Sequence, residues 1–234
     1  MSAFSLRAAA LLCMLVDHTG LALFPAVDAF RCVGRLAFPL YCFLLAQGYL
    51  HTRSVRAYAR RLLLAALLSE IPFDLLIFGR LSCTVEQNVL FSLLLGLMAL
   101  YAADTLRAHP PAAWLAGGLL CLAAMATHVS FGWLGIALCL CARYAQGSRL
   151  RLALGTGALL VLYTLSLLLS GVERGWALTS LWALAAIPLM LLYNGRPGVR
   201  APALTFLFYA AYPLHLAALA AIRAMRIVPP YYLN

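Results

Sequence analysis

The fold is indicated first by residues 3–24, which read AFSLRAAALLCMLVDHTGLALF. A helix of this length is about 30 Å long, which matches the hydrocarbon core of a bilayer. No short apolar run followed by a small-residue cleavage site precedes it, so residues 1–24 are predicted to be a retained first membrane span. Similar apolar runs, broken by Arg, Pro, Gly or polar residues, follow along the rest of the chain.

These runs predict an all-α fold, a polytopic transmembrane helix bundle that forms one membrane domain over residues 1–234. We expect about nine spans, with a range of roughly 8 to 10. They are predicted near residues 3–24, 31–50, 58–78, 89–104, 112–127, 131–145, 152–170, 176–193 and 202–223. The fifth and sixth spans are short and separated by residues 128–130 alone, so they form a tight hairpin or a partly re-entrant pair. Because 65% of the residues are hydrophobic and 10% charged, a soluble domain is excluded.

The basic residues predict an orientation for the bundle. All 17 are Arg, and 7 acidic residues leave a net charge of +10. With the N-terminus in the cytoplasm, 11 arginines fall on the inner side and 6 on the outer side, as the positive-inside rule favours. The chain is therefore predicted to be a multi-pass protein of the cell (plasma) membrane, whose arginines meet anionic lipid rather than nucleic acid. The seven cysteines show no metal-ligand spacing, so we expect inert core thiols and no metal.

Polar residues inside the first span indicate where chemistry could occur. Arg7 and His18 are eleven residues apart, or three helical turns plus about 20°, so they share one face. The rise of about 16 Å puts Arg7 at the cytosolic mouth and His18 in the outer half of the membrane. Asp17 points about 100° away from His18, so we expect it to meet a group on another span.

The same topology brings eight polar residues from five spans to one depth in the outer half of the membrane. They are Asp17, His18, Arg35, Glu70, Asp74, Gln87, Asn88 and His215. Polar groups are expensive in hydrocarbon, so they usually face a cavity. We expect a polar chamber that opens outward. It would hold a histidine as general base or nucleophile, carboxylates that orient it and amides that stabilise an oxyanion.

Several of these residues also have a purely structural interpretation. Glu70 precedes Pro72 and could mark a helix break. Gln87 and Asn88 could cap the fourth span, and His215 could pack beside a proline kink. On the cytosolic side, the densest basic cluster could bind a nucleotide or pyrophosphate, or it could only anchor the topology. Its members are His51, Arg53, Arg56, Arg60 and Arg61.

Sequence blocks along nearly the whole chain resemble the TraX family, which is associated with pilin N-acetylation and conjugation. The blocks are LRA at 6–8, VDHTG at 16–20, RCVGRLAFP at 31–39, GYLHTR at 48–53, RRL at 60–62, SEIPFD at 69–74, QNVLF at 87–91 and YAAYPLHL at 209–216. TraX proteins are similar to the wider membrane acyltransferase superfamily, which includes the acyltransferase type 3 proteins. That superfamily has a basic residue, ten residues of any kind and then histidine in its first span. Arg7 and His18 fit this spacing.

The resemblance implies transfer of an acetyl group from cytosolic acetyl-CoA to an acceptor at or beyond the outer face. It implies that His18 is the catalytic histidine and that Arg7, Arg60 and Arg61 hold the CoA phosphates. One block departs from the family pattern, because Phe131 stands where relatives tend to have tyrosine. If that missing hydroxyl touches substrate, the acceptor or the activity would differ.

The leading hypothesis is a membrane-bound acetyltransferase whose partners are the bilayer, acetyl-CoA and a pilin-like polypeptide or glycan. His18, oriented by Asp17, Glu70 or His215, would deprotonate the acceptor or carry the acyl group. Gln87, Asn88 or Arg35 would stabilise the oxyanion. The alternative is a small-solute or proton-coupled transporter, although no inverted repeat is evident. A third possibility is a scaffold whose polar residues only join helices.

Overall fold

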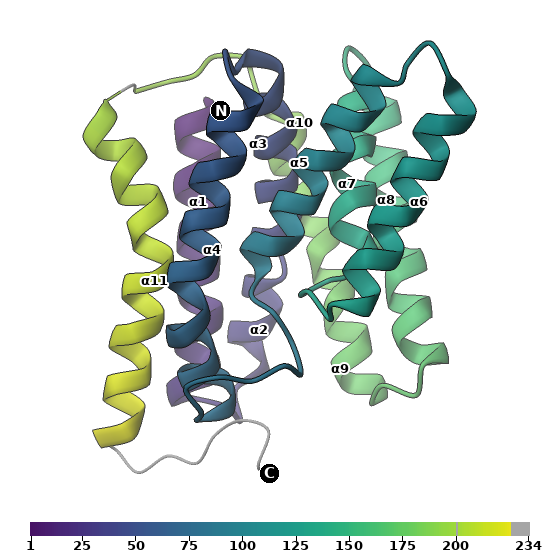
Figure 1. The fold of residues 1–234 in the computed structure, drawn as a ribbon. Helices are drawn as coiled ribbons and strands as arrows, with labels where there is room; N and C mark the ends of the chain where they lie inside the picture. The colour runs from purple at the N-terminus through teal and green to yellow at the C-terminus, as the bar shows by residue number, and fades with distance from the viewer. Residues whose placement is uncertain (200, 226–234) are drawn as a thin grey trace.

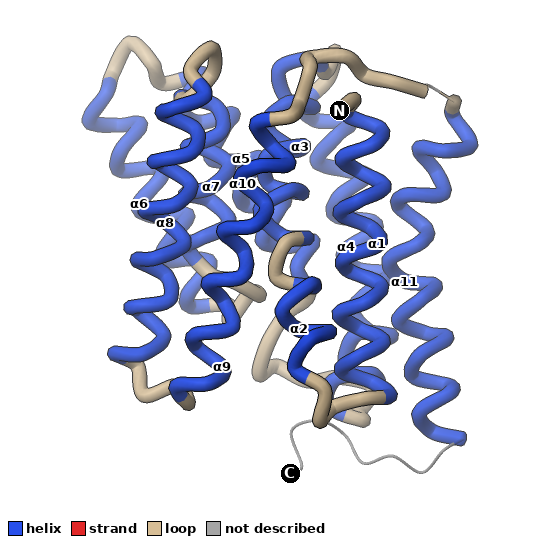
Figure 2. Tube along the Cα trace, turned by 180° about the vertical axis from the view of Figure 1, so that it is seen from behind, coloured by secondary structure: helices blue, strands red, loops and turns tan. Residues whose placement is uncertain are grey.

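A computed structural model describes residues 1–199 and 201–225. The elements are all helical within these ranges (Figures 1 and 2). They are α1 (Ala3–Leu23), α2 (Asp28–Gly34), α3 (Ala37–His51), α4 (Val55–Phe78), α5 (Val89–Thr105), α6 (Pro110–Ala126), α7 (Trp133–Tyr144), α8 (Arg149–Leu169), α9 (Arg174–Thr179), the 3₁₀ helix η1 (Ser180–Ala185), α10 (Ala186–Leu191) and α11 (Pro202–Met225). Two arginines used for the orientation, Arg200 and Arg226, lie outside the described residues.

The helices follow the predicted ranges to within a few residues and confirm the all-α class. The second predicted span consists of α2 and α3, and the eighth of α9, η1 and α10. Among the described residues, five helical segments are long and apolar enough to cross a membrane: Ala3–Leu23, Asp28–His51, Arg149–Leu169, Arg174–Leu191 and Phe206–Met225. The count of nine spans stays a prediction, because α4 carries five charged residues and α5, α6 and α7 are shorter.

The end of the bundle at which α1 begins is called the Met1 side, and the end at which α1 finishes is called the Leu23 side (Figure 1). α1 begins on the Met1 side, where Ser2 caps it by accepting a hydrogen bond from the Ser5 N–H. The N–H groups of Ala3 and Phe4 donate to the carbonyls of Arg196 and Pro197, at 2.8 and 3.1 Å. First-turn donors that a helix leaves unpaired are thus satisfied by the segment between α10 and α11.

The connection between α6 and α7 runs inside the bundle. α6 and α7 are short, and their junction stops before the ends of α8 and α11 on the Leu23 side (Figure 1). Val129 and Ser130 are buried there, and the residue pair Gln87–Val129 forms a parallel bridge to the segment that leads into α5. The Gln87 N–H donates to the His128 carbonyl and the Ser130 N–H to the Gln87 carbonyl, both at 3.0 Å. Because their backbone N–H and carbonyl groups bind each other, these two non-helical segments can lie inside the bundle of a membrane protein.

α4 and α11 each continue through an internal proline. Pro72 lies inside α4, so the helix break considered for Glu70 does not occur. Pro213 lies inside α11 in the same way, two residues before His215.

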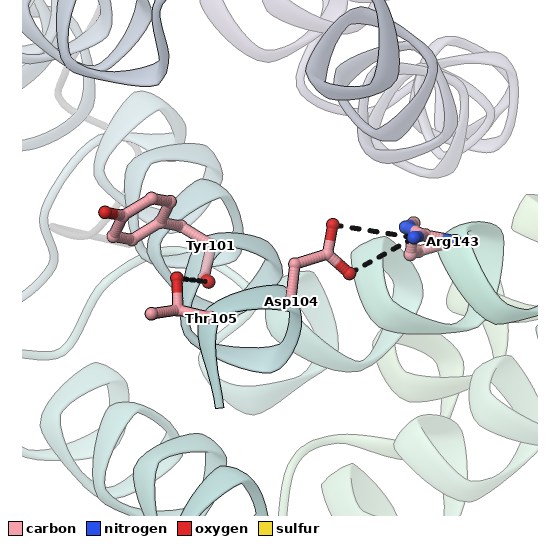
Figure 3. Close-up of polar contacts among 4 residues, drawn as sticks. All are labelled: Tyr101, Asp104, Thr105 and Arg143. Carbon is pink, nitrogen blue, oxygen red and sulfur yellow. Dashed lines mark hydrogen bonds and ion pairs between the residues drawn. The ribbon is translucent and has the colours of Figure 1, made fainter. Parts of the chain in front are cut away.

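α5 and α7 pack closely in the centre of the bundle. Gly96 of α5 is buried against Cys139 of α7, and a Cβ at Gly96 would lie 2.7 Å from the Cys139 sulfur. At the Met1 side of the same two helices, Arg143 binds the carboxylate of Asp104 (Figure 3). The shorter of the two N–O distances is 3.1 Å.

We predict that Gly96→Ala destabilises the protein by about 1 to 3 kcal/mol, because the added methyl group overpacks the α5–α7 contact. Gly118→Ala is the matched control, since nothing lies within 4 Å of a Cβ on that exposed face of α6. Replacing glycine there should be neutral or stabilise by roughly 0.5 to 1 kcal/mol. Thermal unfolding in detergent measures both, and equal melting temperatures would contradict the proposed packing.

Candidate functional site

A cavity of about 260 Å³ lies in the Leu23 half of the bundle. We call it the histidine cavity. Its wall is formed by α1, α2, α3, α4, α5, α8, α9 and α11, and by the segments between α4 and α5 and between α6 and α7. Its lining includes Asp17, His18, Arg31, Arg35, Tyr41, Glu86, Ser130, Tyr163, Trp176 and Tyr212.

Two histidines from α1 and α11 contact each other at this cavity. His18 Nδ1 lies 2.6 Å from His215 Nε2, and the two rings lie edge to edge with nearly parallel planes and centroids 4.9 Å apart. His215 Nδ1 lies 2.6 Å from the Ala211 carbonyl oxygen. A carbonyl only accepts, so in a neutral His215 the proton is on Nδ1 and Nε2 accepts. His18 then donates through Nδ1 and keeps a lone pair on Nε2, which makes that nitrogen the available base.

Asp17 lies beside His18 in sequence but has its partner on α2. Its carboxylate binds the Arg31 guanidinium at 2.7 Å, as expected for a residue that points away from His18. Gly34 allows this arrangement, because a side chain there would collide with Asp17. The structure thus brings Asp17 to the cavity as the ion-pair partner of Arg31.

Arg31 and Arg35 form the polar end of the cavity together with Trp176. Their guanidinium carbons lie 4.8 and 4.5 Å from the centre of the Trp176 ring, within the range of cation–π attraction. Glu86 lines the same cavity and accepts a hydrogen bond from the Ser130 hydroxyl at 2.7 Å. Burial raises the pKa of the Glu86 carboxyl, while the Ser130 hydrogen bond and the two nearby guanidinium groups oppose that shift.

Four residues of this cavity are not among the site residues predicted from the sequence: Arg31, Glu86, Ser130 and Trp176. Arg31 is four positions before Arg35, so the two share a helix face. Glu86 and Ser130 are adjacent to residues that were considered. Trp176 is at the start of a predicted span, where sequence alone predicts an interfacial belt residue rather than a site residue.

Other predicted site residues lie outside the cavity lining. Asn88 caps α5 by accepting from the Leu90 N–H at 3.0 Å, and its amide donates to the Ala66 carbonyl and the Glu70 carboxylate. Asp74 accepts from the Cys83 N–H at 2.8 Å. Together with Gln87, these residues fasten the connection before α5 to its neighbours, so the structure does not bring them to His18. Of the two residues considered as caps, Asn88 caps α5. No group of three His, Cys, Asp or Glu side chains that could hold a metal occurs in the described part of the chain.

A second cavity, of about 290 Å³, lies toward the Met1 side. We call it the arginine cavity, since Arg7 and Arg61 line it. The Arg7 guanidinium lies over the Phe208 ring at 5.3 Å, and that of Arg61 over the Tyr58 ring at 5.5 Å. Arg60 is exposed and is not part of the lining. Arg7 and His18, which share one face of α1, therefore border different cavities: Arg7 the arginine cavity and His18 the histidine cavity.

We predict that Asp17→Asn destabilises the protein by about 3 kcal/mol, because it leaves a mostly buried Arg31 charge without its carboxylate. The Arg31 and Asp17 side chains are 12% and 17% exposed, whereas those of Arg143 and Asp104 are 29% and 34% exposed. Asp104→Asn is thus the matched control, with an expected loss of about 0 to 1 kcal/mol. A larger loss for the control in thermal or denaturant unfolding would contradict this.

Comparisons with known proteins add to this geometry. The chain is 36% identical over 110 residues to "Probable fimbrial assembly protein FimC, serogroup H1" of Dichelobacter nodosus. That match covers 42% of this chain and 45% of the relative, so the chain aligns with less than half of the curated protein. No solved structure matches. Residues 2–223 match the family described as "TraX protein", a range that runs from α1 into α11 and includes both cavities, and the chain therefore belongs to the TraX family.

Proposed function

We propose that this chain is an integral membrane acyltransferase that moves an acetyl group from cytosolic acetyl-CoA to an acceptor at or beyond the outer face. The observation that carries the proposal is the pairing of His18 with His215, which leaves His18 Nε2 as a base on the wall of a cavity. Family membership supports the reaction class, because TraX proteins are associated with pilin acetylation. In this proposal the Met1 side faces the cytoplasm.

His18 would act as the general base and His215 as the group that positions it. His18 Nε2 takes a proton from the acceptor amine as its nitrogen attacks the thioester carbonyl carbon. The C–N bond forms, the C–S bond breaks and the CoA thiolate leaves with the proton that His18 releases. The acceptor gains one acetyl group and CoA leaves as the free thiol. Arg35, which lines the cavity, would stabilise the oxyanion that forms between these two steps.

The arginine cavity would receive the donor. Its volume suits the narrow arm that carries the thioester better than a whole nucleotide, so the phosphates would remain at the mouth. Arg7 and Arg61 are placed to bind them, since guanidinium groups bind phosphate oxygens in pairs. Arg60 is left out of this role because its side chain is outside the lining.

A polypeptide acceptor has more support than a glycan. The curated relative from Dichelobacter nodosus is described as a fimbrial assembly protein, and fimbriae are built from pilin subunits. We propose the α-amino group of a pilin-like polypeptide as the acceptor.

Binding of acetyl-CoA to detergent-purified protein tests the donor site. Arg7→Ala/Arg61→Ala should lower affinity by about tenfold or more, because two charge-assisted contacts are lost. Arg60→Ala, the matched control, should bind as wild type does, and His18→Ala should bind acetyl-CoA but transfer nothing to a peptide with a free α-amino group. Calorimetry measures acetyl-CoA binding, and the mass of the peptide measures transfer.

Folded wild-type protein that does not bind acetyl-CoA would contradict the proposal. It would favour a transporter, for which the cavities in opposite halves of the bundle would serve as alternating entrances.

Substitution of His215 tests the positioning role. His215→Leu should lower kcat by about 100-fold without changing acetyl-CoA binding, because His18 loses the acceptor that fixes its tautomer. His215→Gln, whose carbonyl can accept the same proton, should recover part of that rate. Equal kcat values for the two variants would show that His215 is only a packing residue.

A further inference from the structure

Two tyrosines separate the histidine cavity from the arginine cavity. Tyr41 of α3 and Tyr212 of α11 line both cavities, which lie in opposite halves of the bundle. Tyr41 also packs against both of the main hydrophobic clusters of the core. The two rings therefore lie where the cavities adjoin, on the direct route from one to the other.

The same wall is directly beside the histidine pair. The Tyr212 ring lies 6.0 Å from the His18 ring and 5.6 Å from the His215 ring, centroid to centroid. Tyr212 is 4% exposed and lies one helical turn before His215, so the position of its ring is fixed by the packing around it. An acyl group that arrives from the arginine cavity thus meets Tyr212 immediately before it reaches His18.

We propose that Tyr41 and Tyr212 form a constriction that selects the acyl group by its width. The proposal rests on the acyltransferase function above, because it is the donor that enters through the arginine cavity. An unbranched group such as acetyl has the cross-section of a single carbon chain and can follow the thin thioester arm between two rings. A carbonyl whose next carbon is branched, as in isobutyryl, is wider at the point where it must approach His18. Isobutyryl has two methyl groups on that carbon where acetyl has hydrogens, and even one additional methyl group in a tight apolar site is worth about 10- to 200-fold in kcat/KM.

A panel of acyl donors tests this constriction. Wild type should prefer acetyl-CoA to isobutyryl-CoA by at least about tenfold in thiol release with a peptide acceptor. Tyr212→Ala and Tyr41→Ala should reduce that preference by about tenfold, since removal of a ring widens the passage. Tyr212→Phe should retain the preference, because the ring and not the hydroxyl sets the width. Tyr58→Ala, the matched control, removes a ring that lines the arginine cavity alone and should leave the ratio unchanged.

The possible outcomes distinguish this inference from the proposed function. Wild-type protein that transfers no acyl group at all would overturn the acyltransferase itself. Wild type that transfers acetyl while both alanine variants keep its preference would overturn the constriction alone. An equal shift in Tyr58→Ala would also overturn it, because the effect would then come from general loosening. If an alanine variant fails to fold, Tyr212→Leu and Tyr41→Leu remove the ring but retain apolar packing, and the same ratio is decisive.

Discussion

A polar side chain below the surface of this bundle depends on a partner within the protein, because lipid offers neither hydrogen bonds nor counter-charges. Several of these pairs join two helices. Asp17 of α1 binds Arg31 of α2, and His18 of α1 contacts His215 of α11. Asn88, at the start of α5, binds the backbone and a carboxylate of α4. The positions of α2, α5 and α11 relative to α1 and α4 are therefore set by polar contacts as well as by apolar packing.

The same constraint divides the polar residues into two groups. A residue whose hydrogen bonds are used within the fold, such as Asn88, has little capacity left for a ligand. His18 is different, because its partner occupies one ring nitrogen and leaves the other available. Arg35 lines the cavity and faces an aromatic ring, which a guanidinium group can share with a ligand. We therefore expect chemistry at a side chain such as His18, which keeps one polar atom that the fold itself does not use.

Apolar run length gave the helix positions reliably, because a helix that faces lipid must be apolar for its whole length. It did not reveal the break between α2 and α3, where composition hardly changes. The depth of His18 and His215 followed from topology, whereas their contact depends on how two distant helices are rotated. Arg60 and Arg61 show the same limit, since neighbours on a helix point about 100° apart and only Arg61 reaches a cavity. A single sequence contains no information on that rotation.

The hydrogen bonds that complete the first turn of α1 also constrain how the protein can assemble. The Ala3 and Phe4 N–H groups pair with carbonyls of Arg196 and Pro197, which the ribosome adds almost 200 residues later. α1 must therefore enter the membrane with these donors still solvated. The hydrogen bonds of its first turn can form only after α10 has been synthesised. Contacts of such long sequence separation form slowly, because a large loop has to close first. The arginine cavity beside Arg7 would then be completed late in biosynthesis, when the chain is released from the insertion machinery.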